Sequence, residues 1–434
     1  MKTNDLLSKK QFGFLHGRST VLQLLKVLGD WAEILDTSSH KIDAIYMDFQ
    51  KAFDKVPHRR LLNKINGYGL EGETHDWVKA FLHNRSHRVC VNGQVSNSAA
   101  VTSGIPQGSV LGPVLFVLYI NDLPDVVENE VYLFADDTKI YSQINNVTDA
   151  QSLQSDLSKL HDWSEKWLLM FHPEKCKVLH LGNKGDQPFK YKLDDVELEE
   201  TTCEKDLGVN IDNKLSFSEH IDEKVNKANT IMGIVRRSFR HLDIDTFKTL
   251  YKAIVRPHLE YAVSVWNPHL RKHIRKIERV QRRATKQIPE LKNLSYKERL
   301  TALKLPTLVY RRMRGDMIEV YKILTGKYDP SVSDFLPLHR AAVVNDRTRG
   351  HPLKLQKRKF THDICKYSFG RRVTDTWNKL PEAVVTAPTL ITFENRLDAY
   401  WSKLDVKYDF DTAMAKANPL TATGGTGIDL RLVS

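Results

Sequence analysis

Cysteine is scarce in this sequence: its 434 residues contain only four, at positions 90, 176, 203 and 365. The four form no CxxC pair and join no histidines at the spacing of a zinc site. Such isolated thiols argue against a disulfide-stapled secreted domain and against a structural zinc module. We therefore expect reduced thiols in an intracellular protein.

Long apolar runs are also missing. The most apolar stretch, residues 110–120, is shorter than the roughly 18–20 residues of a membrane-spanning helix, and it contains Gly112 and Pro113. The N-terminal residues are polar and lack the apolar segment of a signal peptide. The sequence thus predicts no membrane partner, and residues 110–120 are interpreted as a buried helix.

Acidic residues are in deficit, with 53 Asp and Glu against 65 Lys and Arg, which gives a net charge of +12. Nucleic acid is the obvious partner for this surplus, because Lys and Arg that neutralise phosphates release condensed counterions. A basic protein without such a partner is the alternative. The hydrophobic fraction of 41% is ordinary for a globular protein, so the chain can bury a core.

Hydrophobic periodicity divides the chain into four parts. Residues 1–215 combine helical and strand patterns, which predicts an α+β fold. Residues 216–328 are helical and basic, and residues 329–408 combine prolines with short helical segments. Residues 409–434 end in a Gly- and Thr-rich stretch that we expect to be flexible.

Carboxylates follow apolar strand patterns at two places in the first part. Residues 42–49 predict a buried strand that leads to Asp48, and residues 131–144 predict a hairpin with Asp136 and Asp137 at its turn. Helices are predicted over residues 20–34, 108–121 and 149–171, and strand structure over residues 176–181 and 205–211.

Asp136 and Asp137 are adjacent carboxylates next to a core, so burying both without a counter-charge would cost free energy. A divalent cation removes this conflict, and Asp48 offers a further carboxylate. Paired Mg²⁺ ions held in this way activate an attacking hydroxyl and stabilise a phosphate leaving group. The alternative is a solvent-exposed turn, where aspartate is also a favoured residue.

Several motifs, in order and spacing, carry a family resemblance. Residues 48–54 read Asp-Phe-Gln-Lys-Ala-Phe-Asp, residues 104–113 read Gly-Ile-Pro-Gln-Gly-Ser-Val-Leu-Gly-Pro, and residues 134–137 read Phe-Ala-Asp-Asp. They resemble the three palm boxes of reverse transcriptases. Further resemblance, to non-LTR retrotransposons of the jockey type, lies in residues 11–20, 251–268 and 377–381.

This resemblance implies a right-hand polymerase palm with partial fingers, then a mostly helical basic thumb and a C-terminal region of a retroelement, in an N-terminally truncated chain. The implied activity is an RNA-directed DNA polymerase that transfers nucleotides to a primer 3′-hydroxyl. Its implied partners are an RNA template, a DNA primer and deoxynucleoside triphosphates. Two Mg²⁺ ions, or Mn²⁺, are the implied cofactors, and the nucleus or cytoplasm is the expected location.

The metal and nucleotide residues carry over from the motifs position by position. Asp48 and Asp136 would be the principal metal ligands, the Phe49 carbonyl would complete a metal shell, and Asp137 would support them near the primer terminus. Phe53 corresponds to a steric gate that excludes a ribose 2′-hydroxyl by a clash. A plain core aromatic is the alternative for Phe53.

Three further sets follow from the same resemblance. Lys175 corresponds to a lysine that gives a proton to pyrophosphate, with a solvated strand-edge lysine as the alternative; the family usually has Asn where this chain has His172. The residues expected under the incoming nucleotide and template are Gln107, Gly108 and Ser109, of which Ser109 also suits a helix N-cap. The expected primer grip comprises Leu207, Gly208 and Val209.

Arginines recur at helical spacing in the basic part, which favours contact with a nucleic-acid backbone over a merely solvated face. The set comprises Arg236, Arg237, Arg275, Arg279, Arg282 and Arg283.

A truncated remnant, catalytically weak or inactive, that only binds nucleic acid is the main alternative function. It is favoured because the box that grips the triphosphate in this family is missing ahead of residue 11. A group II intron-type maturase shares the palm boxes, but residues 266–268 argue against it.

Overall fold

The computed structural model describes residues 6–37, 40–182, 189–239, 242–339, 350–402 and 404–415. The chain forms two compact units. Unit 1 comprises Met1–Leu207 and Ile211–Leu215, and unit 2 comprises Gly208–Asn210 and Ser216–Ser434. The predicted domain limits at residues 215, 328 and 408 stay predictions, and the last two of them fall inside unit 2.

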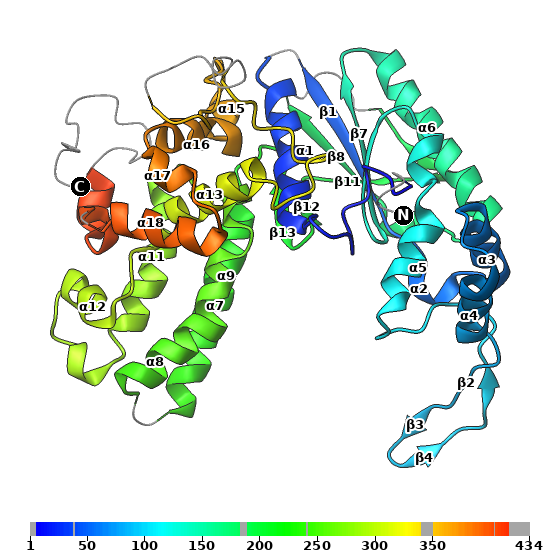
Figure 1. Ribbon diagram of the computed structural model, residues 1–434, viewed down its shortest axis with the longest axis horizontal. Coiled ribbons are helices and arrows are strands. Elements are labelled where there is room, and N and C mark those ends of the chain that lie inside the picture. The colour runs from blue at the N-terminus through cyan, green and yellow to red at the C-terminus, as the bar shows by residue number, and fades with distance from the viewer. Residues whose placement is uncertain are drawn as a thin grey trace. The chain divides into compact units, whose positions relative to one another are not determined.

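Unit 1 is a mixed α/β structure (Figure 1). Its helices are α1 (Thr20–Ile34), α2 (Ala52–Lys55), α3 (His58–Gly67), α4 (Gly72–Leu82), α5 (Leu111–Ile120) and α6 (Val147–Trp167), with 3-10 turns η2 (Leu123–Val126) and η3 (Pro173–Lys175). Its longer strands are β1 (Lys41–Met47), β6 (Glu130–Phe134), β7 (Asp137–Ile144), β8 (Lys177–Gly182), β11 (Glu199–Thr201) and β12 (Cys203–Asp206). The two-residue strands are β2 (Ser86–His87), β3 (Cys90–Val91), β4 (Gln94–Val95), β5 (Ala99–Ala100), β9 (Lys192–Leu193) and β10 (Val196–Glu197).

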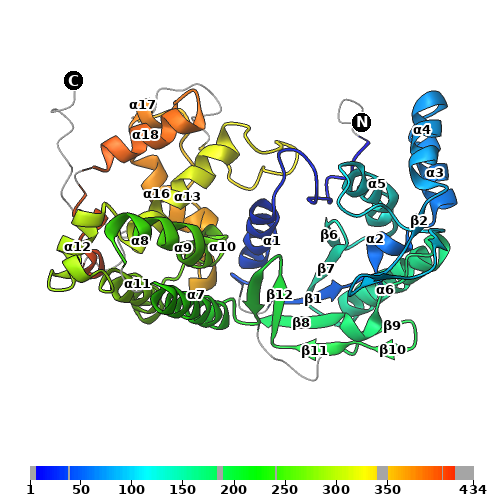
Figure 2. The ribbon, with the colours of Figure 1, turned by 90° about the horizontal axis from the view of Figure 1, so that it is seen from below.

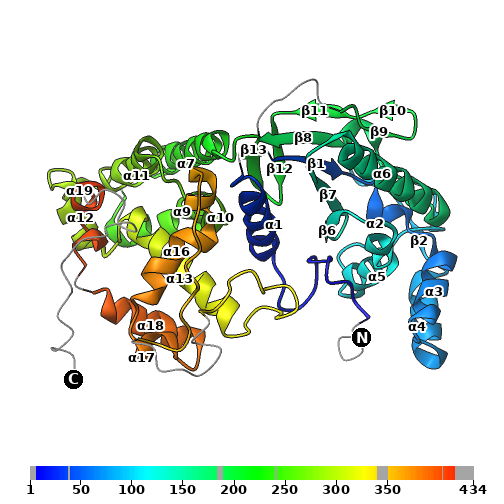
Figure 3. The same cartoon turned by 90° about the horizontal axis from the view of Figure 1, so that it is seen from above.

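The main sheet has the strand order β11-β8-β1-β7-β6, so the chain's first long strand lies at its centre. β1 pairs antiparallel with β7 and with β8, and β6 pairs antiparallel with β7. Ile140 joins the apolar core formed with α5 and α6, whereas Tyr141 meets Trp31 of α1 edge-on at 5.5 Å. Because successive strand residues point to opposite faces, α1 and α6 cover opposite faces of the sheet (Figures 2 and 3).

Helix α1 has the predicted bounds, and local chemistry explains why. The Ser19 side chain accepts a hydrogen bond from the Leu22 amide, which satisfies one of the free N–H groups of the first turn. Leucines at helical spacing then bury one side of the helix. The prediction of a strand leading to Asp48 is also confirmed, although β1 ends at Met47.

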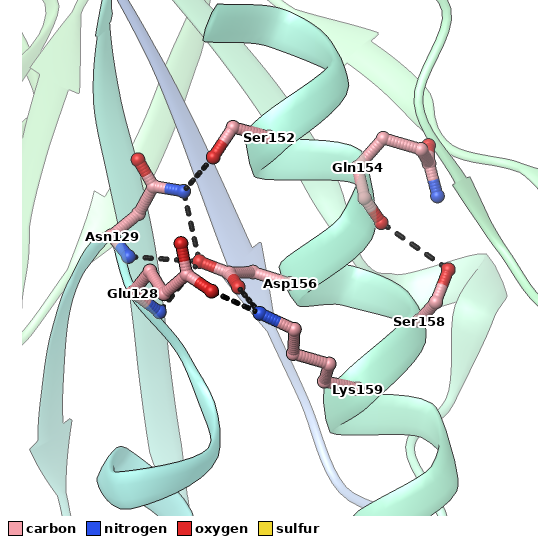
Figure 4. Close-up of polar contacts among 7 residues, drawn as sticks. All are labelled: Glu128, Asn129, Ser152, Gln154, Asp156, Ser158 and Lys159. Atoms are coloured by element: carbon pink, nitrogen blue, oxygen red, sulfur yellow. Dashed lines mark hydrogen bonds and ion pairs between the residues drawn. The ribbon is translucent and has the colours of Figure 1, made fainter.

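Helix α6 is anchored to the loop that starts β6 (Figure 4). The buried Asp156 carboxylate accepts hydrogen bonds from the Glu128 and Asn129 amides at 3.0 and 2.8 Å, and it pairs with Lys159 at 3.0 Å. Burial alone would raise the pKa of Asp156, but these hydrogen bonds outweigh it and lower that pKa. The ionised carboxylate thereby fixes where β6 begins, and β6 leads to the acidic turn.

Two helix predictions were wrong at their ends. The helix predicted to reach residue 171 ends at Trp167, because Leu168 takes a left-handed φ of 53° that stops it. The helix predicted from residue 108 begins at Leu111, because Gly108 has a φ of 77°.

Unit 2 is almost entirely helical in its described residues (Figure 1). Its helices are α7 (Ser218–Ser238), α8 (Ile244–Leu250), η4 (Tyr251–Val255), α9 (Arg256–Glu260), α10 (Val263–Trp266), α11 (Arg271–Thr285), η5 (Pro289–Leu291), α12 (Tyr296–Leu303), α13 (Leu308–Leu324), α15 (Asp363–Tyr367), α16 (Phe369–Asn378), α17 (Glu382–Val385), α18 (Leu390–Tyr400), η6 (Asp405–Lys407) and α19 (Phe410–Ala415). α19 occupies the start of the predicted flexible tail, and residues 416–434 lie outside the described part of the chain.

A buried ion pair links distant segments of unit 2. Arg372 of α16 contacts both carboxylate oxygens of Asp316 on α13, at 3.0 and 2.9 Å, and also donates to the Ser264 carbonyl at 2.6 Å. Asn267 donates to the same Asp316 carboxylate at 3.0 Å. The segment of residues 251–268 is therefore tied through Asp316 to α16, the helix that ends at Asn378.

Candidate functional site

The acidic turn lies beside the end of the central strand. Met47, the last residue of β1, faces Thr138 of β7, so Asp48 emerges next to the β6–β7 hairpin. The hairpin prediction is confirmed, but its turn was placed one residue too late. Phe134 pairs with Asp137, so Ala135 and Asp136 form the turn and Asp137 begins β7. The turn closes early because Ala135 takes a left-handed φ of 55°.

The electrostatics of the turn favour a positive partner. Burial raises the pKa of Asp136, and the charge of Asp48 raises it further. Desolvation, and then the neighbouring charge of Asp136, raises the pKa of Asp137 to about 6. The charge of Asp48 thus acts on the Asp136 carboxylate, although 88 residues separate the two in the sequence (136 minus 48). A cation between them would relieve both the repulsion and the desolvation.

Lys175 supplies one such positive charge. Its Nζ lies 3.1 Å from Asp48 Oδ2, and both side chains are partly exposed, at 60% and 42%. The residue is carried by η3, whose position is set by a hydrogen bond from the His172 amide to the Asp48 carbonyl at 2.8 Å. Because that bond uses backbone atoms, the unusual side chain at His172 does not disturb it.

The site offers oxygen donors that suit a divalent metal. Across the described segments, no three His, Cys, Asp or Glu side chains come close enough together to hold a metal ion. The pair Asp48 and Asp136 offers hard oxygen ligands under mutual repulsion, which is the kind of donor that Mg²⁺ prefers together with phosphate and water oxygens. Phe49, expected to add its carbonyl, has its ring stacked on Phe171 at 4.2 Å, so its backbone is firmly placed.

Phe53 and the Gly-Pro-rich box lie together in unit 1. The Phe53 ring, half-buried on α2, stacks on Phe116 of α5 at 4.3 Å with an interplanar angle of 19°. The Ile105 amide donates to the Phe53 carbonyl at 2.8 Å, which fixes the box beside α2. At Gly104, a Cβ atom would lie 2.5 Å from the Asp54 carbonyl oxygen, so only glycine fits.

The remaining residues of the box are placed as follows. Gln107 Nε2 donates to Asp54 Oδ1 at 2.8 Å, and both side chains are exposed. Gly108 has open space around it. The N-cap position, which was the alternative role for Ser109, belongs to Val110. The Ser109 hydroxyl still accepts a hydrogen bond from the Gly112 amide at 2.9 Å and so satisfies a first-turn N–H.

The predicted primer-grip residues form a hairpin turn. Leu207 and Gly208 have left-handed φ values of 45° and 85°, between β12 and β13 (Val209–Asp212). The strand predicted over residues 205–211 is therefore two strands, because Leu207 and Gly208 reverse the chain. Val209 is fully buried.

Sequence reasoning missed one charged pair at this site. Lys139 of β7 and Asp206 of β12 are both buried and form an ion pair, which ties the strand of Asp137 to the predicted primer grip. A pocket of about 280 Å³ opens here, lined by both of these residues and by Asp48, Asp137 and Lys175. The available signal was a lysine on an otherwise buried strand face.

The six predicted nucleic-acid-binding arginines lie on two helices of unit 2, and all are exposed. Arg236 and Arg237 lie in the last turn of α7, and the others lie on α11, whose opposite side is buried. Arg282 is already engaged, since its guanidinium lies 4.8 Å from the centre of the Tyr296 ring and 3.7 Å from Asp411. The other three predicted arginines of α11, which are Arg275, Arg279 and Arg283, have exposed side chains.

Residues 1–211 match the family described as reverse transcriptase (RNA-dependent DNA polymerase). Residues 1–211 are thus a reverse transcriptase domain of the RNA-directed DNA polymerase family, related to the domains of non-LTR retrotransposons.

Individual relatives agree with this assignment. The chain is 30% identical to the RNA-directed DNA polymerase from mobile element jockey of Drosophila melanogaster, over 65% of this chain and 32% of that protein. It is 26% identical to the probable RNA-directed DNA polymerase from transposon BS of the same organism, over 82% of this chain and 40% of that protein. The chain thus spans about a third of the length of the first curated relatives it matches.

Among solved structures, a telomerase from Candida albicans, in complex with a fragment of telomeric RNA, aligns with 64% of this chain and 52% of that chain. The identity is 9% and the TM-score 0.38.

None of the described helices combines the length and apolarity needed to cross a membrane.

Proposed function

We propose that this chain is the reverse transcriptase portion of a non-LTR retrotransposon and extends a primer on an RNA template by two-metal nucleotidyl transfer. The observation that carries the proposal is the position of Asp48 after the end of β1 and of Asp136 in the β6–β7 turn, where the charge of Asp48 raises the pKa of Asp136. The family match of residues 1–211 supports it independently.

In this proposal the residues of unit 1 have separate roles in the reaction. Asp48, Asp136 and the Phe49 carbonyl would hold two Mg²⁺ ions, which would supply the positive charge that activates the 3′-hydroxyl and stabilises the departing pyrophosphate. Asp137 is the supporting third carboxylate, near the primer terminus. Lys175, whose Nζ lies 3.1 Å from Asp48 Oδ2, gives a proton to the leaving group in this proposal.

Other residues select the deoxynucleotide and contact the template and primer. The Phe53 ring, whose orientation is fixed by stacking on Phe116, excludes a ribose 2′-hydroxyl by a steric clash. Gln107, Gly108 and Ser109 contact the incoming deoxynucleotide and the template, and the turn of Leu207, Gly208 and Val209 contacts the primer. The exposed arginines of α7 and α11 neutralise phosphates of the template and primer, so binding weakens as salt rises.

Extension of a labelled DNA primer on an RNA template, with Mg²⁺ and all four deoxynucleotides, tests the proposal. We expect full-length product from the unmutated chain and none from Asp136→Asn, with equal binding of the primer–template by both proteins in fluorescence anisotropy. Binding without extension by the unmutated chain would instead establish the alternative, a protein that only binds nucleic acid.

A further inference from the structure

The segment of residues 10–13 lies against the acidic turn. The Phe12 amide donates to the Leu133 carbonyl at 2.7 Å, and the Leu133 amide donates to the Lys10 carbonyl at 2.9 Å. Gln11 pairs with Leu133 as a parallel bridge. Because β6 is the edge strand of the main sheet, this segment covers its free edge and runs alongside the strand that ends at the turn.

The Gln11 side chain also contacts the β6–β7 turn. Its Oε1 accepts two hydrogen bonds, from the Gly13 amide at 2.7 Å and from the Ala135 amide at 3.0 Å. Gln11 is fully buried, so water cannot replace either bond. Ala135, whose amide it holds, is the residue that immediately precedes Asp136.

Gly13 packs on the same backbone. A Cβ atom at Gly13 would lie 2.4 Å from the Ala135 nitrogen and 3.0 Å from the Phe134 carbonyl carbon. Real Cβ atoms do not approach backbone so closely, so any other residue would displace the turn or the segment. Glycine is needed here for close contact rather than for a positive φ.

The turn needs such support because of Ala135. In the left-handed region the Cβ of an alanine lies too close to neighbouring backbone, so this conformation is less stable than its ordinary one, and here the φ of Ala135 is 55°. A strained residue of this kind persists only when its surroundings hold it. The direction in which Asp136 leaves the turn depends on that φ.

We propose that Gln11 and Gly13 are positioning residues for Asp136: the buried amide of Gln11 and the missing side chain of Gly13 hold Ala135 left-handed and so aim the catalytic carboxylate. The catalytic meaning of this inference rests on the proposed function, whereas its structural content does not.

Hydrogen exchange at the Ala135 amide tests the structural content directly. Gln11→Met keeps the length of the side chain and removes the acceptor, so exchange at Ala135 should quicken at least tenfold. Gln11→Glu keeps an acceptor oxygen and should retain the protection. Gln154→Met is the matched control, because Gln154 on α6 also bridges backbone, at Lys192, but lies in another part of unit 1. Unchanged exchange at Ala135 in Gln11→Met overturns the proposal.

The Mg²⁺ dependence of primer extension separates positioning from mere folding. Outer residues that orient a metal ligand typically contribute about 10- to 100-fold to metal affinity or activity, so Gln11→Met should raise the half-saturating Mg²⁺ concentration by about that factor. A merely structural residue would lower the thermal midpoint and the yield of folded protein but leave the half-saturating concentration unchanged, and that result would overturn the proposal.

Gly13→Ala is a second, independent variant, and Gly29→Ala is its control. Gly29 lies within α1 and has open space around it, so alanine there should leave both exchange and Mg²⁺ dependence unaltered. Gly13→Ala should change both. If the unmutated chain extends no primer, the proposed function fails, while the exchange measurement still decides whether Gln11 and Gly13 hold the turn.

Discussion

Replacing Phe53 with valine should relax the discrimination between deoxynucleotides and ribonucleotides. The ring is held by its stack on Phe116 at 4.3 Å and by an edge contact with Phe14 at 6.4 Å. Because Phe53 is half-buried, losing the aromatic pair and part of the apolar area should cost about 1–2 kcal/mol of folding free energy. Domains are stable by about 5–15 kcal/mol, so the variant should still fold.

The effect on discrimination follows from the size of the group being excluded. A pocket rejects a single extra group by about 1–3 kcal/mol, or roughly 10- to 200-fold. The ratio of kcat/KM for dNTP to that for the matching rNTP should therefore fall by that factor in Phe53→Val and stay high in Phe53→Tyr. Phe81→Val is the matched control, because Phe81 is also half-buried and stacked, on Trp77 of α4. Discrimination by Phe53→Val equal to that of the unmutated chain would refute the role of the ring.

Three further outcomes are expected. In the folded protein at pH 8, exposed Cys90 should be alkylated at least 100-fold faster than Cys176, because burial raises the pKa of the Cys176 thiol to about 11; equal rates by mass spectrometry would contradict this. Arg372→Met should lower the free energy of unfolding in urea by about 3–5 kcal/mol, because Asp316 then stays buried without its charged partner. An unchanged urea midpoint of unfolding would contradict this stabilising role of the ion pair. Lys175→Met should slow single-turnover extension by about 10²- to 10⁴-fold without changing the thermal midpoint, since the side chain is 60% exposed; an unchanged rate would rule out proton donation.

Local signals in the sequence located the main elements of the site. The helical pattern over residues 20–34 and the apolar run before Asp48 predicted α1 and β1 well, because both depend on neighbouring residues only. The hairpin was predicted for the same reason. Its turn was misplaced by one residue because Ala135, which carries no side-chain signal for a left-handed φ, closes it.

Contacts between distant residues could not be predicted in this way. Gln11 and Ala135 are 124 residues apart, and Lys139 and Asp206 are 67 apart. No local periodicity encodes either pair, although both act on the strand or turn that carries the acidic residues. The family resemblance supplied the expected roles of the motif residues, but not the contacts that hold them in place.

The most direct test of a two-carboxylate metal site is single-nucleotide addition to a primer while the Mg²⁺ concentration is varied. We expect addition to require the metal and to fall by at least about 10³-fold in Asp48→Asn and in Asp136→Asn. Asp162→Asn, an exposed aspartate on α6, should react like the unmutated chain. Addition by Asp48→Asn or Asp136→Asn at the unmutated rate, with the same Mg²⁺ dependence, would contradict the assignment of these two residues as the metal ligands.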